Sequence, residues 1–219
     1  MKFESKSKEG QDILVHKLLG NQGFFLDVGC AQPVGDNNTY ALEKSGWDGL
    51  LFDWAKDPAS FLKRKATYFK VDVASPEFVD ILSRESPRDV DYISLDVEES
   101  SEAALKNILD NNIKFKVMTF EHNSHADRGS MRDSSRELLF EAGYKILFGD
   151  VRMKCRRVTV FFALGGKRRT VRNWGSFEDW WINPDFFEEE LMHCASKDIF
   201  WEDCVDLIPE KQNFYRKAD

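Results

Sequence analysis

Acidic residues end three short apolar runs in the first third of the chain. The runs FFLDV, GLLFDW and YFKVDV contain Asp27, Asp53 and Asp72 at or near their last positions. A carboxylate repels phosphate, attracts a cation and accepts hydrogen bonds from hydroxyl and amino groups. These acids predict a pocket for a cationic nucleoside, with Asp27 near the positive charge, Asp53 on the ribose and Asp72 on the adenine. Asp72 alone would equally fit a helix cap before Pro76.

The loop after the first run lacks the glycine spacing of a dinucleotide site. Gly29 follows Asp27 by two positions and the next glycine is Gly35, so GxGxxG is absent. A glycine just past a strand allows a ligand to approach the backbone closely. S-adenosylmethionine, which carries an ammonium, a sulfonium and no phosphate, fits this pattern. Trp54 is expected to stack on its adenine, and Gly35 and Val73 are assigned to the same cofactor site.

Polar residues at the ends of two later runs predict acid–base chemistry. DVDYISLDVEES supplies Asp96 and Glu98, and FKVMTFEHN supplies Glu121, His122 and Asn123. Side chains alternate along a strand, so Asp96 and Glu98 are expected to point the same way. His122 is the predicted general base, since its ordinary pKa suits neutral pH, and the three acids are predicted catalytic partners. A structural role for His122 stays open, as does a Mg²⁺ site formed by Asp96, Glu121 and Asn123.

The elements that must position these residues alternate between strands and helices. Apolar runs predict strands over residues 24–28, 49–54, 68–73, 90–97, 115–121 and 144–151. Helices are predicted over residues 11–19, 38–45, 76–84, 102–111 and 133–142. This alternation is typical of an α/β fold in which helices cover both faces of a parallel sheet and ligands bind outside the carboxyl ends of the strands.

Beyond residue 153 the pattern changes. VTVFFAL and RTVRNW flank GGKR and predict a β-hairpin, and FEDWWI predicts a short aromatic strand that ends at Asn183-Pro184. We expect a single domain over residues 1–219. It would comprise an N-terminal helical segment (1–22), a cofactor-binding core (23–153) and a C-terminal elaboration of hairpin and helical pieces (154–219).

Charge is unevenly distributed along the 219 residues, whose formal net charge is −7. Residues 151–176 contain eight Lys or Arg and no acid, whereas residues 177–219 contain twelve acids and four bases. The basic stretch either complements the acidic tail or receives an anionic substrate. No apolar run reaches the ~18 residues of a membrane span, and no signal peptide or CxxC pair is visible. A cytoplasmic protein with reduced cysteines and no membrane span is therefore expected.

Several linked motifs together resemble the FkbM-like class I S-adenosylmethionine-dependent methyltransferases. They are GQD at 10–12, GFFLDVG at 23–29, NTYALEK at 38–44, GWDGL at 46–50, LDVEES at 95–100 and FEH at 120–122. The resemblance covers about residues 11–123, with a weaker echo at 177–184. It implies a Rossmann-like, mostly parallel sheet of seven strands and O-methylation of a hydroxyl on a sugar or small metabolite. It also implies a cofactor site lined by Gln11, Asp27, Gly29, Asn38, Thr39, Asp53 and Asp72, with Asp96, Glu98 and His122 facing the substrate.

The chain departs from the family pattern in several places, among them Asp53 where Glu is commoner, and the departure at Glu99 bears on the substrate. CAQP follows Gly29 where the family more often has Ala-Asn-Asp-Gly, and Glu99 replaces a glycine. Three other functions therefore stay open. The basic residues of 151–176 could bind the phosphates of a nucleic-acid acceptor, or the fold could bind a nucleoside or a partner protein without catalysis. A dinucleotide oxidoreductase is disfavoured by the missing glycines. The oligomeric state is not predicted.

Overall fold

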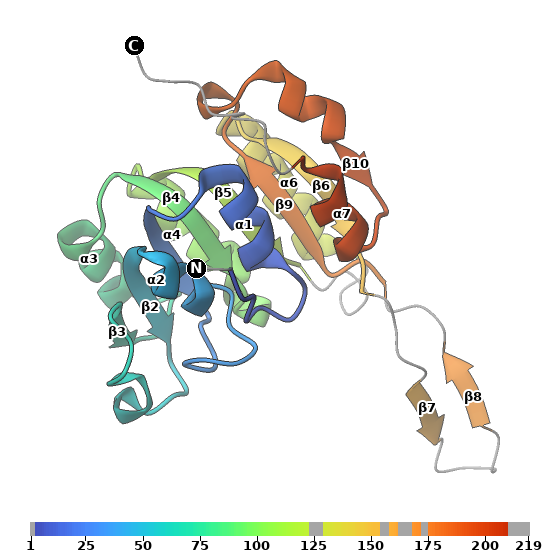
Figure 1. The fold of residues 1–219 in the computed structure, drawn as a ribbon. Coiled ribbons are helices and arrows are strands. Elements are labelled where there is room, and N and C mark those ends of the chain that lie inside the picture. Colours follow the sequence, from blue (N-terminus) through green and yellow to red (C-terminus); the bar gives the residue numbers. More distant parts are fainter. Residues whose placement is uncertain (1–2, 123–128, 154–157, 162–167, 172–174, 210–219) are drawn as a thin grey trace.

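The main sheet holds eight strands in the order β10-β6-β9-β5-β4-β1-β2-β3 (Figure 1). The computed structural model describes residues 3–122, 129–153, 158–161, 168–171 and 175–209. The strands of this sheet are β1 (Phe24–Val28), β2 (Asp48–Asp53), β3 (Thr67–Lys70), β4 (Asp89–Leu95), β5 (Lys114–Glu121), β6 (Lys145–Val151), β9 (Glu178–Ile182) and β10 (Ser196–Lys197). The implied count of seven is wrong, because the two residues of β10 pair with Phe148 and Gly149 of β6.

The sheet is mixed but mostly parallel, as expected. Among the described strands of this sheet, β9 alone runs antiparallel, and it lies between β5 and β6. The chain passes from β1 outward through β2 and β3, then crosses to β4 on the other side of β1. The strand order therefore reverses between β1 and β4. In open α/β sheets, ligands bind outside the carboxyl ends of the strands at such a reversal.

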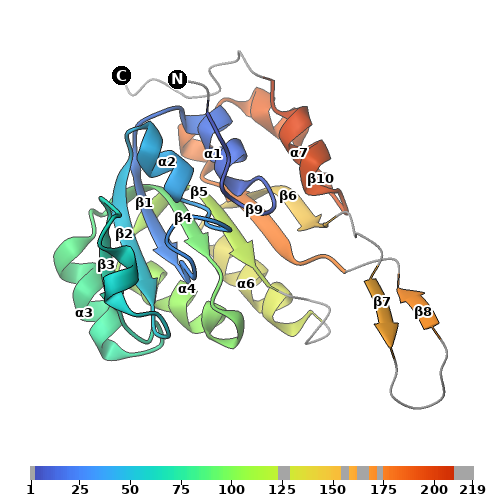
Figure 2. The same cartoon turned by 60° about the horizontal axis from the view of Figure 1, so that its bottom comes forward.

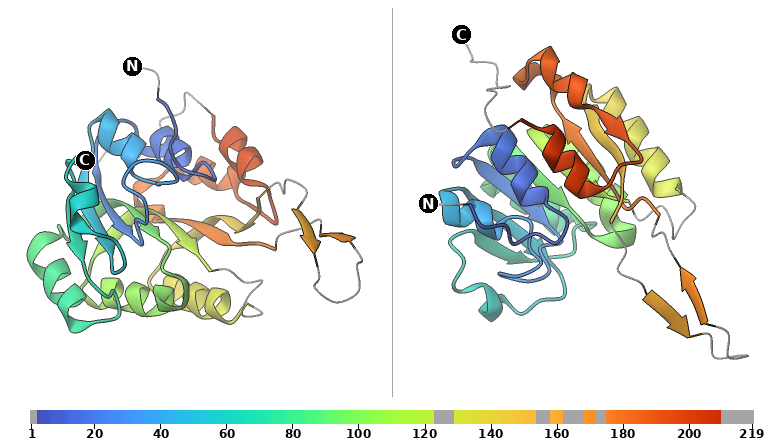
Figure 3. Two further views of the ribbon diagram at one scale, coloured as in Figure 1. Left: turned by 90° about the horizontal axis from the view of Figure 1, so that it is seen from below. Right: turned by 45° about the vertical axis from the view of Figure 1, so that its right-hand side comes forward.

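Helices cover both faces of the sheet, which confirms the predicted layering (Figure 3). They are α1 (Gln11–Leu19), α2 (Tyr40–Ser45), α3 (Pro76–Glu85), α4 (Ser101–Asp110), α6 (Ser130–Glu141) and α7 (Trp201–Leu207). Residues of α1, α2 and α7 pack in one buried apolar cluster, and residues of α3, α4 and α6 pack in a second. Trp180 and Trp181 of β9 enter opposite clusters, because successive side chains of a strand point to opposite faces.

Local sequence accounts for the element that follows the third strand. Ser75 caps α3 by accepting a hydrogen bond from the amide of Phe78, and Pro76 occupies the first turn. The capping residue is therefore Ser75, and Asp72 instead accepts a hydrogen bond from the amide of Ala74 at 2.9 Å. The third strand also ends earlier than predicted, at Lys70, which leaves Asp72 in an exposed turn.

The predicted hairpin pairing is confirmed and stands apart from the main sheet (Figure 2). β7 (Val158–Phe161) pairs antiparallel with β8 (Arg168–Val171), and the Gly-Gly turn lies outside the described residues. Short 3₁₀ helices complete the fold: η1 (Pro58–Phe61), η2 (Glu98–Ser100), η3 (Pro184–Phe186) and η4 (Glu189–Cys194). Within the described ranges, no helix has the length and apolar character needed to cross a membrane.

Candidate functional site

Two adjoining cavities open at the carboxyl ends of the strands where the sheet order reverses. The larger has a volume of about 680 Å³ and the smaller about 240 Å³. Gly29, Ala31 and Asp96 belong to the walls of both. Gly29 and Ala31 follow β1 and Asp96 follows β4, so the shared wall stands where ligands bind in such sheets.

The larger cavity gathers predicted site residues from three successive strand ends. Asp53, Trp54, Asp72, Val73 and Glu98 all line it. The two oxygens of Asp53 accept hydrogen bonds from the amides of Ala31 (3.1 Å) and Ala55 (2.8 Å). The indole of Trp54 is 73 % exposed and free to stack on a planar group.

The charges around the larger cavity select against phosphate. Five carboxylates belong to its wall, those of Asp53, Asp72, Asp96, Glu98 and Glu99. Lys56 is the one basic residue among the described residues that line it. Such a wall repels a pyrophosphate and favours a ligand that is cationic or neutral. A planar, hydroxyl-bearing cation is the ligand this cavity suits.

Gly29 is required by the backbone that surrounds it. Its φ is +93°, and a Cβ at this position would collide with the carbonyl oxygen of Asp96. Its amide donates a hydrogen bond to the carbonyl of Phe52 at 2.8 Å. The sequence predicted a glycine here so that a ligand could approach the backbone. The absence of a side chain also allows the loop after β1 to pack closely against the backbone that follows β4. Gly35, also predicted to border the ligand, is exposed in open space and lines neither cavity.

Asp27 is buried at the end of β1 and is part of the wall of the smaller cavity. Its Oδ2 accepts hydrogen bonds from the hydroxyl of Thr39 (2.6 Å) and the amide group of Asn37 (3.2 Å). Burial raises the pKa of Asp27, and these contacts, together with the Arg64 charge, oppose the rise. Thr39, predicted to bind the cofactor directly, is fully buried against Asp27 and shapes the cavity from behind.

Gln11 and Asn38 line the smaller cavity, as does Lys8. Gln11, the first residue of α1, donates its Nε2 hydrogen bond to Oε2 of Glu178 at 3.1 Å. Asn38 donates to the hydroxyl of Ser94 at 3.0 Å. The Oε1 of Gln11 also accepts a hydrogen bond from the amide of Glu9 at 3.2 Å, so these bonds fix both side-chain amides in the cavity wall.

Four carboxyl groups, which we call the acidic group, lie together at and beneath the smaller cavity. Its members are Glu9, Asp96, Glu121 and Glu178. Burial, followed by the charge of Glu121 and a hydrogen bond with it, raises the pKa of Asp96 well above its ordinary value. Burial also raises the pKa of Glu178, which accepts a 2.6 Å hydrogen bond from the indole of Trp180. A carboxylate with a raised pKa is a proton acceptor better matched to neutral pH.

His122 lies in a different environment from its neighbour Glu121. Glu121 is opposite Glu178 in the β5–β9 register, whereas His122 lies beside Asp179, because alternate side chains point to opposite faces. The His122 side chain is fully buried, with Nε2 3.5 Å from Oδ1 of Asp179, and it lines neither cavity. The carboxylates of Asp96 and Glu121, not the predicted imidazole, therefore face the smaller cavity.

Glu98 does not share the direction expected of it. β4 ends at Leu95, so Asp96 and Glu98 do not continue one strand. Glu98 has a left-handed φ of +50°, begins η2 and is exposed. It lines only the larger cavity, while Asp96 is shared by both.

The second ionic cluster, which we call the arginine-paired cluster, holds two carboxylates between two guanidinium groups. Arg136 donates two hydrogen bonds of 2.7 Å to Asp179, and Arg132 and Arg136 each lie 3.1 Å from Asp150. Donor atoms of His122, Asp150 and Asp179 lie within 4.8 Å of one another, a spacing that would suit a metal ion. Since both carboxylates are already neutralised by arginine, this cluster does not fit a divalent cation. The predicted Mg²⁺ site is not tested, because Asn123 lies outside the described residues.

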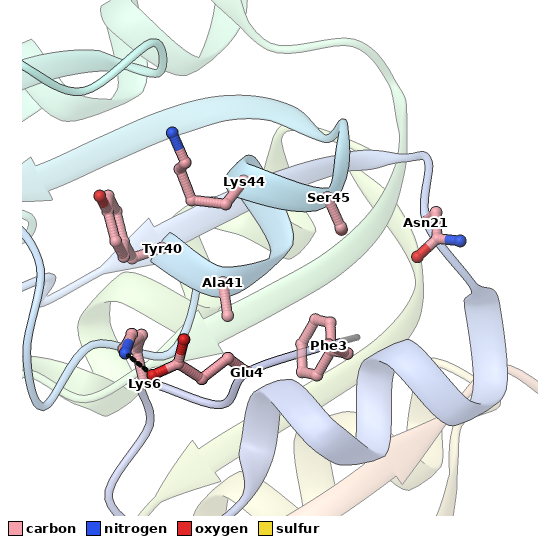
Figure 4. Close-up of a pocket in the computed structure, with 8 residues that line it drawn as sticks. All are labelled: Phe3, Glu4, Lys6, Asn21, Tyr40, Ala41, Lys44 and Ser45. Atoms are coloured by element: carbon pink, nitrogen blue, oxygen red, sulfur yellow. Dashed lines mark hydrogen bonds and ion pairs between the residues drawn. The ribbon is translucent and has the colours of Figure 1, made fainter. Parts of the chain in front are cut away.

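A third cavity of about 490 Å³ lies between the N-terminal segment and α2 (Figure 4). Ala41 and Ser45 of α2 face Phe3 across it, and Tyr40 and Lys44 belong to its rim. It has no lining residue in common with the two cavities at the strand ends.

Two important residues were missed by reasoning from the sequence. Arg64 has a buried side chain that contacts the loop around the smaller cavity, but FLKRKATYF gives no sign of its burial. Glu178 stands in FEDWWI, and an acid within a buried aromatic strand is a signal that could have marked it.

The chain was compared with family models, curated proteins and solved structures. No family model and no curated protein matches the chain. It is similar to precorrin-6y C5,15-methyltransferase from Geobacter metallireducens GS-15, with a TM-score of 0.47 and 15% identity, covering 83% of this chain and 92% of that one. It is also similar to human methyltransferase-like protein 13 in complex with SAH, with a TM-score of 0.46 and 13% identity, covering 96% and 92%. At these scores and identities, the matches decide neither fold nor function.

Proposed function

We propose that the chain is an S-adenosylmethionine-dependent methyltransferase that methylates a hydroxyl group of a sugar or small metabolite. The observation that carries the proposal is the larger cavity. Asp53, Asp72 and Asp96, at or just beyond the ends of three strands of one sheet, stand in its wall, and the described part of the lining contains a single basic residue. This wall suits a nucleoside that carries positive charge and no phosphate.

Each part of the cofactor has residues to hold it. Asp53 would accept hydrogen bonds from the ribose hydroxyls, Trp54 would stack on the adenine, and Asp72 with Val73 would border the base edge. The amino-acid part would lie toward Gln11 and Asn38 in the smaller cavity, whose acidic wall suits an ammonium group. When bound, S-adenosylmethionine supplies a methyl group activated by its sulfonium.

The residues of the smaller cavity supply positioning and a proton acceptor. An acceptor hydroxyl bound there would donate its proton to the carboxylate of Asp96 or Glu121 as its oxygen becomes nucleophilic. Met153 and Phe177 provide apolar wall that excludes water from this point. Alignment of the acceptor oxygen would supply much of the acceleration, because methyl transfer is an in-line displacement.

The proposal is tested by calorimetry with three ligands and by mass spectrometry of the purified protein. S-adenosylmethionine and S-adenosylhomocysteine should bind saturably, NAD should not, and a nucleoside thioether or sulfonium should co-purify. Binding of NAD without binding of either S-adenosyl compound would contradict the proposal. Tight cofactor binding without turnover of any alcohol, sugar or nucleic-acid acceptor would instead favour a non-catalytic scaffold.

A nucleic-acid acceptor is the second candidate. Met153 and Phe177, which line the smaller cavity, stand at the two ends of the stretch that holds seven of the eight basic residues in 151–176. The stretch thus begins and ends at the smaller cavity, so a nucleic acid bound by the stretch would lie close to that cavity. RNA retention that falls steeply with salt would support this candidate, and no retention at low salt would dismiss it.

A further inference from the structure

Arg64 is outside both strand-end cavities, yet two nitrogens of its guanidinium bind the loop that borders the smaller one and the third binds α2. Its side chain is 1% exposed. Nε donates to Oε2 of Glu43 at 2.9 Å, Nη1 donates to the carbonyl of Pro33 at 2.9 Å, and Nη2 donates to the hydroxyl of Thr39 at 3.1 Å. Few side chains other than arginine present donors in this planar arrangement.

Through the hydroxyl of Thr39, Arg64 is connected to Asp27 near the end of β1. A hydroxyl has one hydrogen to donate, and accepting a bond from Arg64 leaves that hydrogen for another acceptor. In the structure, the shorter bond from the Thr39 hydroxyl goes to Oδ2 of Asp27 at 2.6 Å. Arg64 therefore fixes the direction of the hydroxyl that holds Asp27, a wall residue of the smaller cavity.

The contact with Glu43 ties the two cavities together. Glu43 of α2 is 4% exposed at its side chain and also accepts hydrogen bonds from the amides of Lys65 and Ala66, both at 3.0 Å. The segment that ends at Ala66 begins after β2 with residues 54–56, which line the larger cavity. Arg64 holds the loop of residues 30–39 from the other side, through Pro33 and Thr39. Residues 30, 31 and 36–38 of that loop line the smaller cavity.

The loop of residues 30–39 needs outside support to keep its shape. It contains no helix or strand, and Ala31 and Asp36 have left-handed φ values of 45° and 49°. These backbone angles are unfavourable for residues other than glycine, so the local sequence alone does not favour this conformation. Asn37 supplies part of the support, through hydrogen bonds of 2.9 Å to the carbonyls of Cys30 and Gln32.

We propose that Arg64 is a positioning residue of the cofactor site. It holds residues 30–39 in the ligand-binding conformation and couples that loop to the segment that lines the larger cavity. The inference rests on the proposed function for the identity of the ligand. Because a pre-formed loop does not have to be ordered on binding, loss of Arg64 weakens binding even in molecules that remain folded.

The test compares Arg64→Lys with Arg136→Lys. Arg136 anchors another buried network, through Asp179 and Asp150, and contacts neither cavity. Lysine can keep an ion pair with Glu43 but cannot also reach Pro33 and Thr39. If the competent loop population falls to about one tenth, S-adenosylhomocysteine should bind Arg64→Lys about tenfold more weakly by calorimetry. Arg136→Lys should lower the melting temperature and leave the dissociation constant unchanged.

Hydrogen exchange of the ligand-free protein separates this inference from the proposed function. Exchange at residues 30–39 should rise in Arg64→Lys and stay at the wild-type level in Arg136→Lys. If wild type binds no S-adenosyl compound but this rise is seen, the proposed function fails and the positioning role stands. Wild-type affinity together with wild-type exchange in folded Arg64→Lys would overturn the inference.

A double-mutant cycle tests the path through Thr39 and provides a second route if Arg64→Lys does not fold. Thr39→Val removes the hydroxyl between Arg64 and Asp27 at nearly constant volume. Thr39→Val alone should raise exchange at residues 30–39 and weaken binding of S-adenosylhomocysteine. The effect of Arg64→Lys on affinity should be smaller in the Thr39→Val background, since both changes remove the same path. Unchanged exchange and affinity in Thr39→Val would contradict the path.

Discussion

Two groups of carboxyl groups lie side by side in this fold, and the protein shifts their pKa values in opposite directions. In the arginine-paired cluster, burial raises the pKa of Asp179, but hydrogen bonds and charge from Arg136 and His122 outweigh it and hold the pKa at about 2. In the acidic group, burial and neighbouring carboxylates raise the pKa of both Asp96 and Glu178. Consecutive residues of β9, Glu178 and Asp179, belong to the two different groups.

The difference separates structural carboxylates from those that serve a cavity. Asp179 is neutralised by arginine and joins β9 to α6, so it contributes to stability. In the acidic group, the carboxylates repel one another, and this repulsion contributes to the raised pKa values of Glu9 and Asp96. Both of these residues line the smaller cavity. Perturbed carboxyl groups in a cavity are typical of functional sites. The comparison therefore predicts activity changes from one group and stability changes from the other.

The largest effect should follow from Asp96→Asn, which removes the proposed proton acceptor while keeping its shape. Loss of general-base assistance should lower kcat by roughly 10²–10⁴-fold. Because the wild-type pKa of Asp96 is raised, kcat of wild type should rise with pH through a value above the ordinary carboxyl range. Single-turnover assays across pH measure both. Full activity in Asp96→Asn and in Glu121→Gln would show that the acidic group holds no base.

The next largest effect should come from Arg136→Met in the arginine-paired cluster. This change leaves the fully buried Asp179 without its bidentate partner, and breaking a buried pair costs about 3–5 kcal/mol. Urea unfolding followed by fluorescence measures the loss. The control is Lys106→Met, whose pair with Glu102 is exposed and is worth about 0.3–0.5 kcal/mol. Equal losses in the two variants would remove the distinction between this cluster and ordinary surface pairs.

The sequence predicted the ends of β1 and β2 to within one residue but placed the ends of β3 and β4 two or three residues too late, and it predicted the side-chain partners poorly. The runs around Asp27, Asp53 and Asp96 are local patterns, and the parallel sheet places their ends along one edge whatever the rest of the chain does. The direction of His122 depends instead on β9, a strand more than 50 residues away that inserts antiparallel beside β5. Only that pairing brings Asp179 to the imidazole.

The support of the cavity loop was equally invisible in the sequence. Glu43 and Arg64 are 21 residues apart, and each reads as an ordinary charged surface residue. Their burial arises because α2 and the segment after η1 meet beside β2, a tertiary contact that hydrophobic periodicity does not encode. Gly29 is the opposite case. The sequence indicated that a glycine is needed at this position, but the group that leaves no room for a side chain is the backbone carbonyl of Asp96.

A smaller effect, on ligand affinity, is expected from a change at Asp53. Its carboxylate accepts hydrogen bonds from the backbone amides of Ala31 and Ala55 and so differs from the carboxylates of both groups. Asp53→Ala removes a charge-assisted hydrogen bond to the ribose that is worth about 1.5–3 kcal/mol, so S-adenosylhomocysteine should bind about 10–100-fold more weakly. Asp57→Ala is the matched control, since Asp57 accepts a similar bond from the amide of Ala59 but lines neither cavity. Calorimetry showing the same loss in both variants would assign the effect to loop structure.

The smallest effect is expected from Glu178→Gln. We expect it to change the free energy of unfolding by on the order of 1 kcal/mol, by an amount that depends on pH. Glu178 has a folded-state pKa raised above the unfolded value of about 4.3, so its contribution is complete below that value and is lost as pH rises through the folded pKa. Asp179 has a lowered pKa, so its contribution is present above about 3.9 and is lost as pH falls toward 2. Urea titrations from pH 3 to 9 should show that Glu178→Gln flattens the alkaline decline and leaves the acid decline intact. A variant that lost the acid decline instead would reverse the assignment of the two groups.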